Sequence, residues 1–255
     1  MDKPSRQSRH ILGQRVDYTT YTKATEQVLE MANDGQGGYV CISTVHMVME
    51  GHDDPDFQRI VNGADLVTPD GMPLVWALKL LGIKQAERVY GPTLTTIVCR
   101  EAARQGVPVG FYGGTDEVLE MMKANLLRDY PNLDIAYIYS PPFRPPTDEE
   151  DRQVVEDILN SGAKILFVGI GCPKQERWMA AHKDRLPMPL LGVGAAFDFI
   201  AGIKPQAPRW MQKMGLEWLF RLISEPKRLW WRYIYHNPRF VYKFALQLLG
   251  LKSYQ

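Results

Sequence analysis

The sequence predicts an α/β fold, a Rossmann-like, mostly parallel sheet with helices on both faces, followed by a C-terminal helical appendage. Three observations support this prediction. Short apolar runs alternate with longer segments of helical period as far as Ile203, an order typical of parallel sheets. Glycine turns follow several of these runs. Beyond Ile203 the stretch KPQAPRW leads into a basic, aromatic region, so we expect an α/β domain over residues 1–205 and an appendage over residues 206–255.

The composition is that of a globular protein. Of the 255 residues, 45% are hydrophobic and 23% are charged, which argues against extensive disorder. The three cysteines lie far apart without a CxxC pair, so we expect no disulfide framework, no zinc site and a reducing, cytosolic setting. The polar N-terminus shows no secretory signal, and the most apolar window, residues 190–203, is too short for a membrane span.

Each expected strand is a short apolar run bounded by turn residues. In chain order the runs cover residues 40–43, 66–67, 107–114, 133–140, 163–171 and 188–194, counting the glycine turns that close three of them.

Helical period together with start signals marks the expected helices. Asp54 and Pro55 form an N-cap and first position, Thr115 is a second N-cap, and Pro173 opens the last helix of the domain. The helices are expected from residue 55 onward and over residues 72–81, 92–105, 115–129, 148–160 and 173–182.

Parallel sheets bind their ligands beyond the carboxyl ends of the strands. The turns at these ends should meet at one rim, where we expect binding residues. They are Thr44-Val45-His46, Asp70-Gly71, Tyr112-Gly113-Gly114, Gly169-Ile170-Gly171 and Gly192-Val193-Gly194.

The stretch FVGIGCPKQERWM places Gly169-x-Gly171 between a strand and a helix, which can direct backbone N–H groups at a phosphate. A tight structural turn explains the glycines equally well. The stretch is not a dinucleotide fingerprint, because the third glycine is missing, and no Walker A sequence occurs. Gln175 could contact a sugar hydroxyl, although the pattern favours an exposed residue in the first helical turn.

Two acids have alternative interpretations. Asp70 directly precedes Gly71, so the pattern favours a helix N-cap over a catalytic carboxylate in a cleft. Asp198 lies between Phe197 and Phe199. A carboxylate in such apolar surroundings needs a hydrogen-bonding or charged partner, or a functional role, unless it caps a helix after the glycine turn.

No metal site is expected. Asp54-x-Asp56 resembles a metal-binding DxD, but Pro55 favours a helix start, in which acids complement the helix dipole. His46 and His52 lack partners at the spacing of metal ligands.

The C-terminal region differs sharply in charge from the rest. Residues 206–255 hold nine basic and two acidic residues, a net charge of +7, and four of the six tryptophans. The other 21 basic and 27 acidic residues give residues 1–205 a charge of −6. We expect three helical pieces, residues 208–223, 226–236 and 238–250, broken by Pro226 and Pro238.

Basic aromatic helices of this kind favour an anionic membrane interface, where rings lie at headgroup depth. A packed helical subdomain with a basic exterior is nearly as well supported, and nucleic acid is the least favoured partner. Arg221 and Arg228 lie seven residues apart and would share a face, able to clamp a pyrophosphate, if one helix ran through Pro226.

Taken together, six stretches resemble the WecG/TagA/CpsF family of bacterial glycosyltransferases over about Val16 to Arg232. They are ADLVTPDGMPLVW, ERVYGPTL, FYGGTDEVLE, ILFVGIGCPKQERWM, GVGAAFDFIAG and APRWMQKMGLEWLFRLISEPKR.

The resemblance implies a metal-independent, inverting transfer without a cofactor. A sugar moves from a UDP donor, N-acetylmannosamine in the best-known members, to a polyprenyl-diphosphate-linked sugar of a cell-surface polysaccharide. The resemblance also implies a cytoplasmic protein, peripheral on the inner face of the bacterial cell membrane, that docks through its basic tail. A homo-oligomer is compatible with the sequence.

The family's proposed base falls on Asp70. Its other pocket residues and its C-terminal arginines fall on Thr44, Arg88, Gln175, Asp198, Arg221 and Arg228. His46 stands where many members carry Asn, which leaves a hexose donor such as UDP-glucose open. A membrane-docked protein that binds nucleotide sugars without turnover is the alternative function. An oxidoreductase is disfavoured by the missing fingerprint.

Overall fold

The computed structural model describes residues 7–254, apart from the side chains of Arg209, Lys213 and Arg228. Its centre is a six-stranded parallel sheet with the strand order β4-β3-β8-β7-β5-β6. The strands are β3 (Gly38–Ser43), β4 (Leu66–Pro69), β5 (Val109–Gly113), β6 (Ile135–Tyr139), β7 (Ile165–Gly169) and β8 (Pro189–Gly192). All six expected strands are present, and the predicted α/β fold with a parallel sheet is confirmed.

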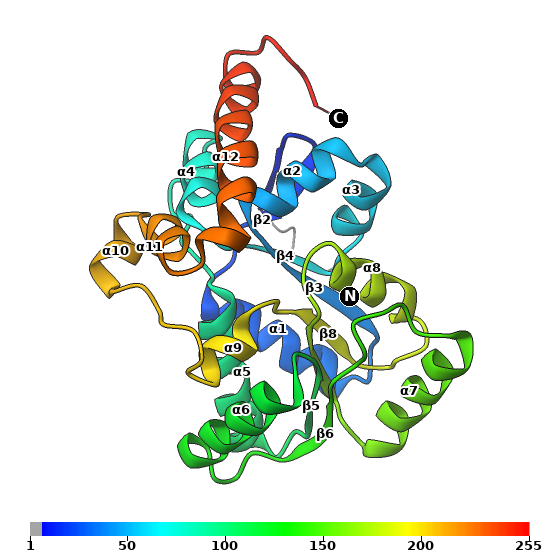
Figure 1. The fold of residues 1–255 in the computed structure, drawn as a ribbon. Coiled ribbons are helices and arrows are strands. Elements are labelled where there is room, and N and C mark those ends of the chain that lie inside the picture. The colour runs from blue at the N-terminus through cyan, green and yellow to red at the C-terminus, as the bar shows by residue number, and fades with distance from the viewer. Residues whose placement is uncertain (1–6, 255) are drawn as a thin grey trace.

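Helices cover both faces of this sheet (Figure 1). One face packs against α1 (Tyr21–Asn33), α5 (Gly91–Gln105), α6 (Asp116–Asp129) and α9 (Ala196–Ile200). The other packs against α3 (Pro55–Asn62), α7 (Asp148–Ser161) and α8 (Lys174–His182). A strand that is buried on both sides carries apolar residues throughout, which explains why these strands appear in the sequence as continuous apolar runs.

The predicted N-caps at Thr115 and Asp54 are confirmed. The Thr115 side chain accepts a hydrogen bond from the Val118 N–H, and one Asp54 carboxylate oxygen accepts from the N–H groups of Asp56 and Phe57. Asp54 also pairs with Arg177 at 2.6 Å. The Asp54-x-Asp56 stretch is therefore a helix start, as its proline indicates.

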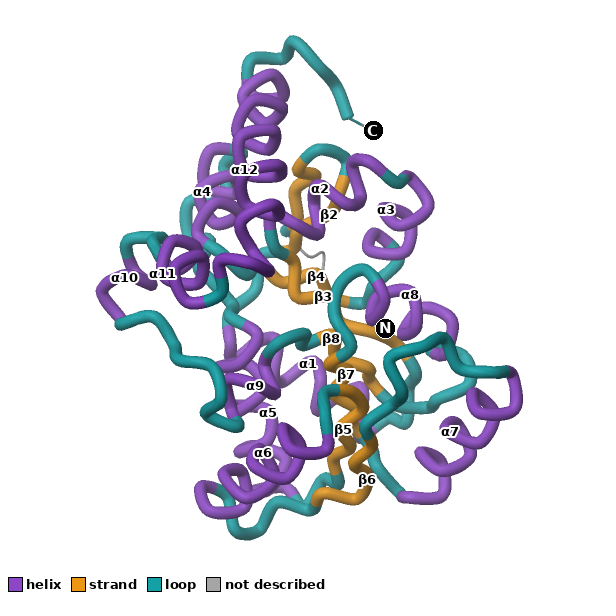
Figure 2. The backbone as a smooth tube through the Cα atoms, viewed as in Figure 1, coloured by secondary structure: helices purple, strands orange, loops and turns teal. Residues whose placement is uncertain are grey.

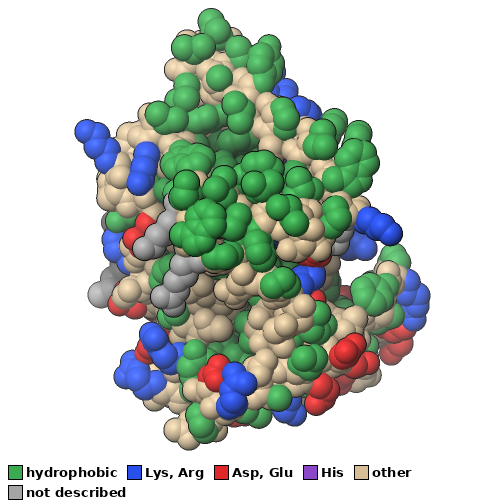
Figure 3. Space-filling view, turned by 60° about the vertical axis from the view of Figure 1, so that its left-hand side comes forward, with side chains coloured by type: hydrophobic (Ala, Val, Ile, Leu, Met, Phe, Trp, Pro, Cys, Tyr) green, Lys and Arg blue, Asp and Glu red, His purple; other side chains and the backbone are tan. Residues whose placement is uncertain are grey.

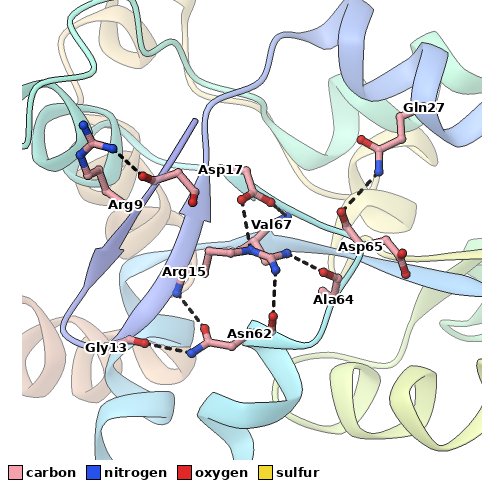
Figure 4. Close-up of polar contacts among 10 residues, drawn as sticks. Arg9, Gly13, Arg15, Asp17, Gln27, Asn62, Ala64, Asp65 and Val67 are labelled. Atoms are coloured by element: carbon pink, nitrogen blue, oxygen red, sulfur yellow. Dashed lines mark hydrogen bonds and ion pairs between the residues drawn. The ribbon is translucent and has the colours of Figure 1, made fainter. Parts of the chain in front are cut away.

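A hairpin of β1 (Ser8–Ile11) and β2 (Gln14–Asp17), which the sequence did not predict, precedes α1. Its strands are short and polar, so they carry little of the alternation that marks a strand. Figure 4 shows how Arg15 fastens it: the backbone N–H donates to the Asn62 side chain at 2.7 Å, and the guanidinium donates to the carbonyls of Asn62 and Ala64. Asp17 accepts from the Val67 N–H at 2.8 Å, which ties the hairpin to β4.

Three helices form the appendage: α10 (Arg209–Lys213), α11 (Glu217–Ser224) and α12 (Pro226–Leu248). The break at Pro226 is confirmed, whereas the break at Pro238 is wrong, because α12 continues through that residue. A proline inside a helix removes one backbone hydrogen bond, and here the burial of neighbouring apolar side chains offsets that cost. Phe240 and Phe244, directly after Pro238, are buried in the hydrophobic cluster described next.

The appendage shares this cluster with the body. Phe240 and Phe244 join residues of the hairpin, of α2 (Val45–Asp53) and of α4 (Met72–Leu80). Polar contacts add to the packing, because Arg239 pairs with Asp53 through two contacts of 2.7 and 2.8 Å. Helix α12 therefore lies against the body, and the domain boundary near residue 205 stays a prediction. Within residues 7–254, every helix is too short or too polar to cross a bilayer.

Candidate functional site

The appendage helices α11 and α12 lie beside the carboxyl ends of β3 and β4 (Figure 2). The residues after these strands and the appendage helices together line a cleft. The body contributes Thr44, Val45, His46, Asp70, Gly71, Met72, Pro73 and Arg88. The appendage contributes Gln212, Gly215, Glu217, Trp218, Arg221, Arg232, Tyr233, His236 and Asn237. Five residues predicted from the sequence meet here: Thr44, His46, Asp70, Arg88 and Arg221.

The centre of the cleft is a chain of three charges. Arg88 donates from Nε and Nη2 to Asp70 Oδ1, both at 3.0 Å, and from Nη1 to Glu217 Oε2 at 2.7 Å. All three side chains are 12–15% exposed. The Arg88 guanidinium also lies 4.2 Å from the centroid of the Tyr90 ring. One arginine thus joins a carboxylate of the sheet to a carboxylate of the appendage.

Asp70 does not cap the helix that follows it, so the interpretation favoured by the sequence pattern is wrong. Gly71 occupies the N-cap position of α4, and no side chain bonds there. The Asp70 backbone N–H donates to Ser43 O at 2.7 Å, which sets the residue at the end of β4. Its carboxylate turns to Arg88, and Oδ2 has a long contact of 3.5 Å with the Gly91 N–H.

The electrostatics of Asp70 suit a base. Burial is the largest influence and raises the pKa of its carboxyl, and the nearby Glu217 carboxylate raises it further, against the lowering effect of Arg88. A carboxylate with a raised pKa accepts a proton more readily than an exposed aspartate.

Thr44 and His46 form the wall of the cleft at the end of β3. The Thr44 side chain accepts a hydrogen bond from the Met47 N–H and so caps α2. Burial, followed by the charge of Arg232 and the neighbouring His236, lowers the pKa of His46 to about 3. The imidazole is therefore neutral near pH 7.

Arg221 enters the cleft from α11. Its guanidinium lies 5.6 Å from the centroid of the Phe199 ring, and among the described residues its buried Nε has no hydrogen-bond partner. A cation with an unused donor suits an anionic ligand. Arg228 belongs to α12 and Arg221 to α11, so the condition that one helix carries both is not met. The Arg228 side chain lies outside the described part of the chain.

Gln175 is buried, so the interpretation as an exposed first-turn residue is wrong. Its Oε1 accepts from the N–H groups of Gly171 and Gly194, both at 3.1 Å, and its Nε2 donates to Glu176 at 2.7 Å. The side chain thereby joins the turns that follow β7 and β8. Because these two amides bond within the protein, the geometry favours a structural turn at Gly169-x-Gly171 over a phosphate cradle.

The remaining predicted residues lie outside the lining of the cleft. A Cβ on Gly113 would stand 2.5 Å from the Gly169 carbonyl carbon, so the close approach of β5 and β7 requires glycine there. Tyr112 is buried, and its ring stacks on that of Trp178 with centroids 4.6 Å apart. Gly114 has a positive φ of 73°, which suits glycine at the turn that follows β5. Asp198 does not cap α9 but pairs with Lys204 at 2.9 Å.

The comparison with known families decides the class of protein. The profile of the glycosyl transferase WecG/TagA/CpsF family matches residues 9–254. The chain belongs to the WecG/TagA/CpsF family. It is therefore a glycosyltransferase, as the resemblance of its motifs implies. It is similar to the N-acetylglucosaminyldiphosphoundecaprenol N-acetyl-beta-D-mannosaminyltransferase of Bacillus spizizenii, with 28% identity over 210 residues, 82% of this chain and 79% of that protein.

Of the appendage residues that line the cleft of the glycosyltransferase, only Arg221 was predicted from the sequence, and Arg232 was not. Glu217, Tyr233 and His236 were not singled out, although all three line the cleft. One signal was available: Glu217 is one of two acids in a strongly basic region, which indicates a specific partner. That partner is Arg88, 129 residues earlier in the chain.

Proposed function

We propose that this glycosyltransferase moves a sugar, N-acetylmannosamine or a hexose, from a UDP donor to a polyprenyl-diphosphate-linked sugar in cell-surface polysaccharide synthesis. The observation that carries the proposal is the Asp70 carboxylate, held in the cleft by Arg88 with its pKa raised. The name of the Bacillus spizizenii relative, which describes transfer of N-acetylmannosamine to a diphosphoundecaprenol-linked sugar, supports the substrate class.

Asp70 is the general base of the proposed reaction. Its Oδ1 accepts two hydrogen bonds from Arg88, whereas Oδ2 has the long Gly91 contact, so Oδ2 is the oxygen free to take a proton. It removes the proton from the acceptor hydroxyl as that oxygen attacks the anomeric carbon. The bond from that carbon to the UDP oxygen breaks on the opposite face, and its electron pair leaves with UDP. The configuration inverts.

The charge of the leaving diphosphate is offset by arginines in this proposal, without a metal or a cofactor. Arg88 is shared by two carboxylates, so the group Asp70–Arg88–Glu217 carries a net negative charge with both acids ionised. Arg221 and Arg232 line the cleft from the appendage and are the cations that we assign to the diphosphate. His46 lines the part of the cleft that we assign to the donor sugar.

We propose that the appendage docks on the cytoplasmic face of the bacterial cell membrane, where the lipid-linked acceptor resides. Figure 3 shows hydrophobic side chains gathered over the part of the surface formed by α4 and the appendage. Large exposed members of the appendage are Trp210, Met214, Trp218, Ile223, Trp230, Trp231, Ile234, Tyr235, Val241 and Tyr242. Aromatic rings beside lysines and arginines suit an anionic lipid interface better than they suit nucleic acid.

Release of UDP tests the proposal. A panel of UDP-sugars is offered with a polyprenyl-diphosphate-sugar acceptor, and we expect acceptor-dependent UDP release. Asp70→Asn should lower it by about 10²- to 10⁴-fold, the usual contribution of a general base, while UDP still raises the melting temperature of the variant. Asp116→Asn, an exposed acid on α6 outside the cleft, is the matched control.

Three outcomes would contradict parts of the proposal. Equal release by wild type and Asp70→Asn removes Asp70 as the base. Release that requires added Mg²⁺ removes the metal-independent mechanism. UDP binding without release for every donor would instead favour a nucleotide-sugar binding protein.

A further inference from the structure

A cluster of two imidazoles and one carboxylate joins the body to the appendage beside the cleft. His46 and Glu50 lie one turn apart on α2, and His236 comes from α12. His46 Nε2 lies 3.3 Å and His236 Nε2 lies 3.8 Å from the same oxygen, Glu50 Oε1. The three side chains offer ligand atoms that all lie within 4.8 Å of one another. Sequence spacing could not show this cluster, because His236 lies far beyond His46 in the chain, in the appendage.

These distances are close to those of a tetrahedral metal site. Zinc binds imidazole nitrogen at about 2.0–2.1 Å and carboxylate oxygen at about 2.0–2.2 Å, so adjacent ligand atoms stand roughly 3.3–3.5 Å apart. The two nitrogen–oxygen separations of 3.3 and 3.8 Å are near this range, whereas the three ligand atoms together lie within 4.8 Å, so the two imidazole nitrogens must come closer to share one ion. A small movement of α12 toward α2 would shorten the separations between His236 and the other two ligands. His46 and His236 also line the cleft, which leaves room for a water as the fourth ligand.

The surrounding charges are of both signs. The charged side chains that act on the Glu50 carboxylate are the acids Asp53 and Asp54 and the cations Arg232 and Arg177. Arg232 opposes a metal ion, whereas the acids favour one. Because the surrounding charges favour neither sign, the types of ligand atom decide which ion the cluster binds.

We propose that His46, Glu50 and His236 bind a divalent transition-metal ion of the Zn²⁺ class, which fastens α12 to α2. Two nitrogens and one oxygen suit Zn²⁺, Co²⁺ or Ni²⁺, whereas Mg²⁺ prefers oxygen ligands only. The ion is thus distinct from the Mg²⁺ that many enzymes use on diphosphates. Its role is structural: it fixes the wall of the cleft that His46 and His236 share.

The test uses the full chain without any sugar nucleotide, so it stands apart from the proposed transferase reaction. After treatment with a chelator, Zn²⁺ is titrated by calorimetry, and Co²⁺ binding is followed by its visible spectrum. We expect one equivalent per chain and the strong absorption of four-coordinate Co²⁺. His236→Gln and Glu50→Gln should each weaken binding by at least about tenfold.

A control on the same helix distinguishes specific from surface binding. His52 also lies on α2 but faces the Tyr254 ring, with centroids 5.4 Å apart, so His52→Gln should leave Zn²⁺ affinity unchanged. Zn²⁺ should also protect the α11–α12 junction of the wild type from protease. The proposal is overturned if the wild type binds no stoichiometric Zn²⁺, or if all three variants bind it equally. Circular dichroism checks that the variants fold, and the Co²⁺ spectrum of the wild type needs no variant.

Discussion

Glu217→Gln is the most informative perturbation of the cleft. Glu217 belongs to the appendage, yet its carboxylate accepts a hydrogen bond of 2.7 Å from Arg88, whose other side holds Asp70. Glutamine keeps the shape and an acceptor oxygen but removes the charge. The substitution therefore tests whether the appendage acts on Asp70 through Arg88, and Glu217 is a positioning residue in this hypothesis.

The magnitude follows from burial. Removing one partner of a buried ion pair costs about 3–5 kcal/mol. The cost here should be smaller, about 2 kcal/mol, because Arg88 keeps Asp70 as a partner and the glutamine oxygen can still accept. If this energy is lost from the transition state, kcat/KM falls about thirtyfold.

The pH profile of kcat/KM separates positioning from mere stability. Burial and then Glu217 raise the pKa of Asp70, and Arg88 lowers it. Removing the Glu217 charge therefore lowers the pKa of Asp70, and since the base acts when deprotonated, the acidic limb of the profile should move to lower pH. Glu225→Gln, whose carboxylate lies 3.5 Å from Lys204 outside the cleft lining, should change kcat/KM by less than about fivefold. An acidic limb that stays in place would refute the reasoning, even if activity falls.

Three further predictions concern stability and membrane binding. Burial raises the pKa of Glu176 to about 7 from 4.5, so its contribution to the free energy of unfolding is present below about pH 4.5 and is lost as the pH rises through 7. In urea unfolding, Glu176→Gln should remove about 3 kcal/mol of this loss of stability between pH 4.5 and 7, whereas Glu156→Gln, at an exposed position, should remove none. Phe240→Ala should lower the free energy of unfolding by about 3 kcal/mol, because Phe240 is 4% exposed, whereas Val241→Ala, 65% exposed, should have little effect. Trp231→Ala should weaken sedimentation with anionic vesicles by roughly tenfold or more at an unchanged melting temperature, and equal binding to neutral vesicles would contradict the charge argument.

The fold was largely predictable because its signals are local. Continuous apolar runs marked the six strands, and caps such as Thr115 marked helix starts. Predictions failed where tertiary packing outweighs a local preference. Pro238 stays inside a helix because Phe240 and Phe244 pack into the body, and the polar β1–β2 hairpin is held by Arg15 contacts distant in sequence.

The site was predictable in part. The rim of the sheet brings Thr44 and Asp70 together, because β3 and β4 are neighbours, whereas Arg88 was expected in the pocket only from the family resemblance. The direction of a side chain is not a local property, so the sequence pattern favoured a helix cap for Asp70 and an exposed position for Gln175. Both assignments depend on partners elsewhere: Arg88 draws the Asp70 carboxylate away from α4, and the glycine amides of two turns bury Gln175.

By itself, the sequence determined the α/β architecture, the basic aromatic tail and the family, because periodicity, charge and motifs are written in consecutive residues. Only the tertiary structure decided that the tail contributes Glu217, Arg232 and His236 to the cleft. Glu217 and His236 follow their partners Arg88 and Glu50 by more than a hundred positions. Contacts at such separations depend on how α11 and α12 pack on the body, and packing is set by the whole buried surface at once.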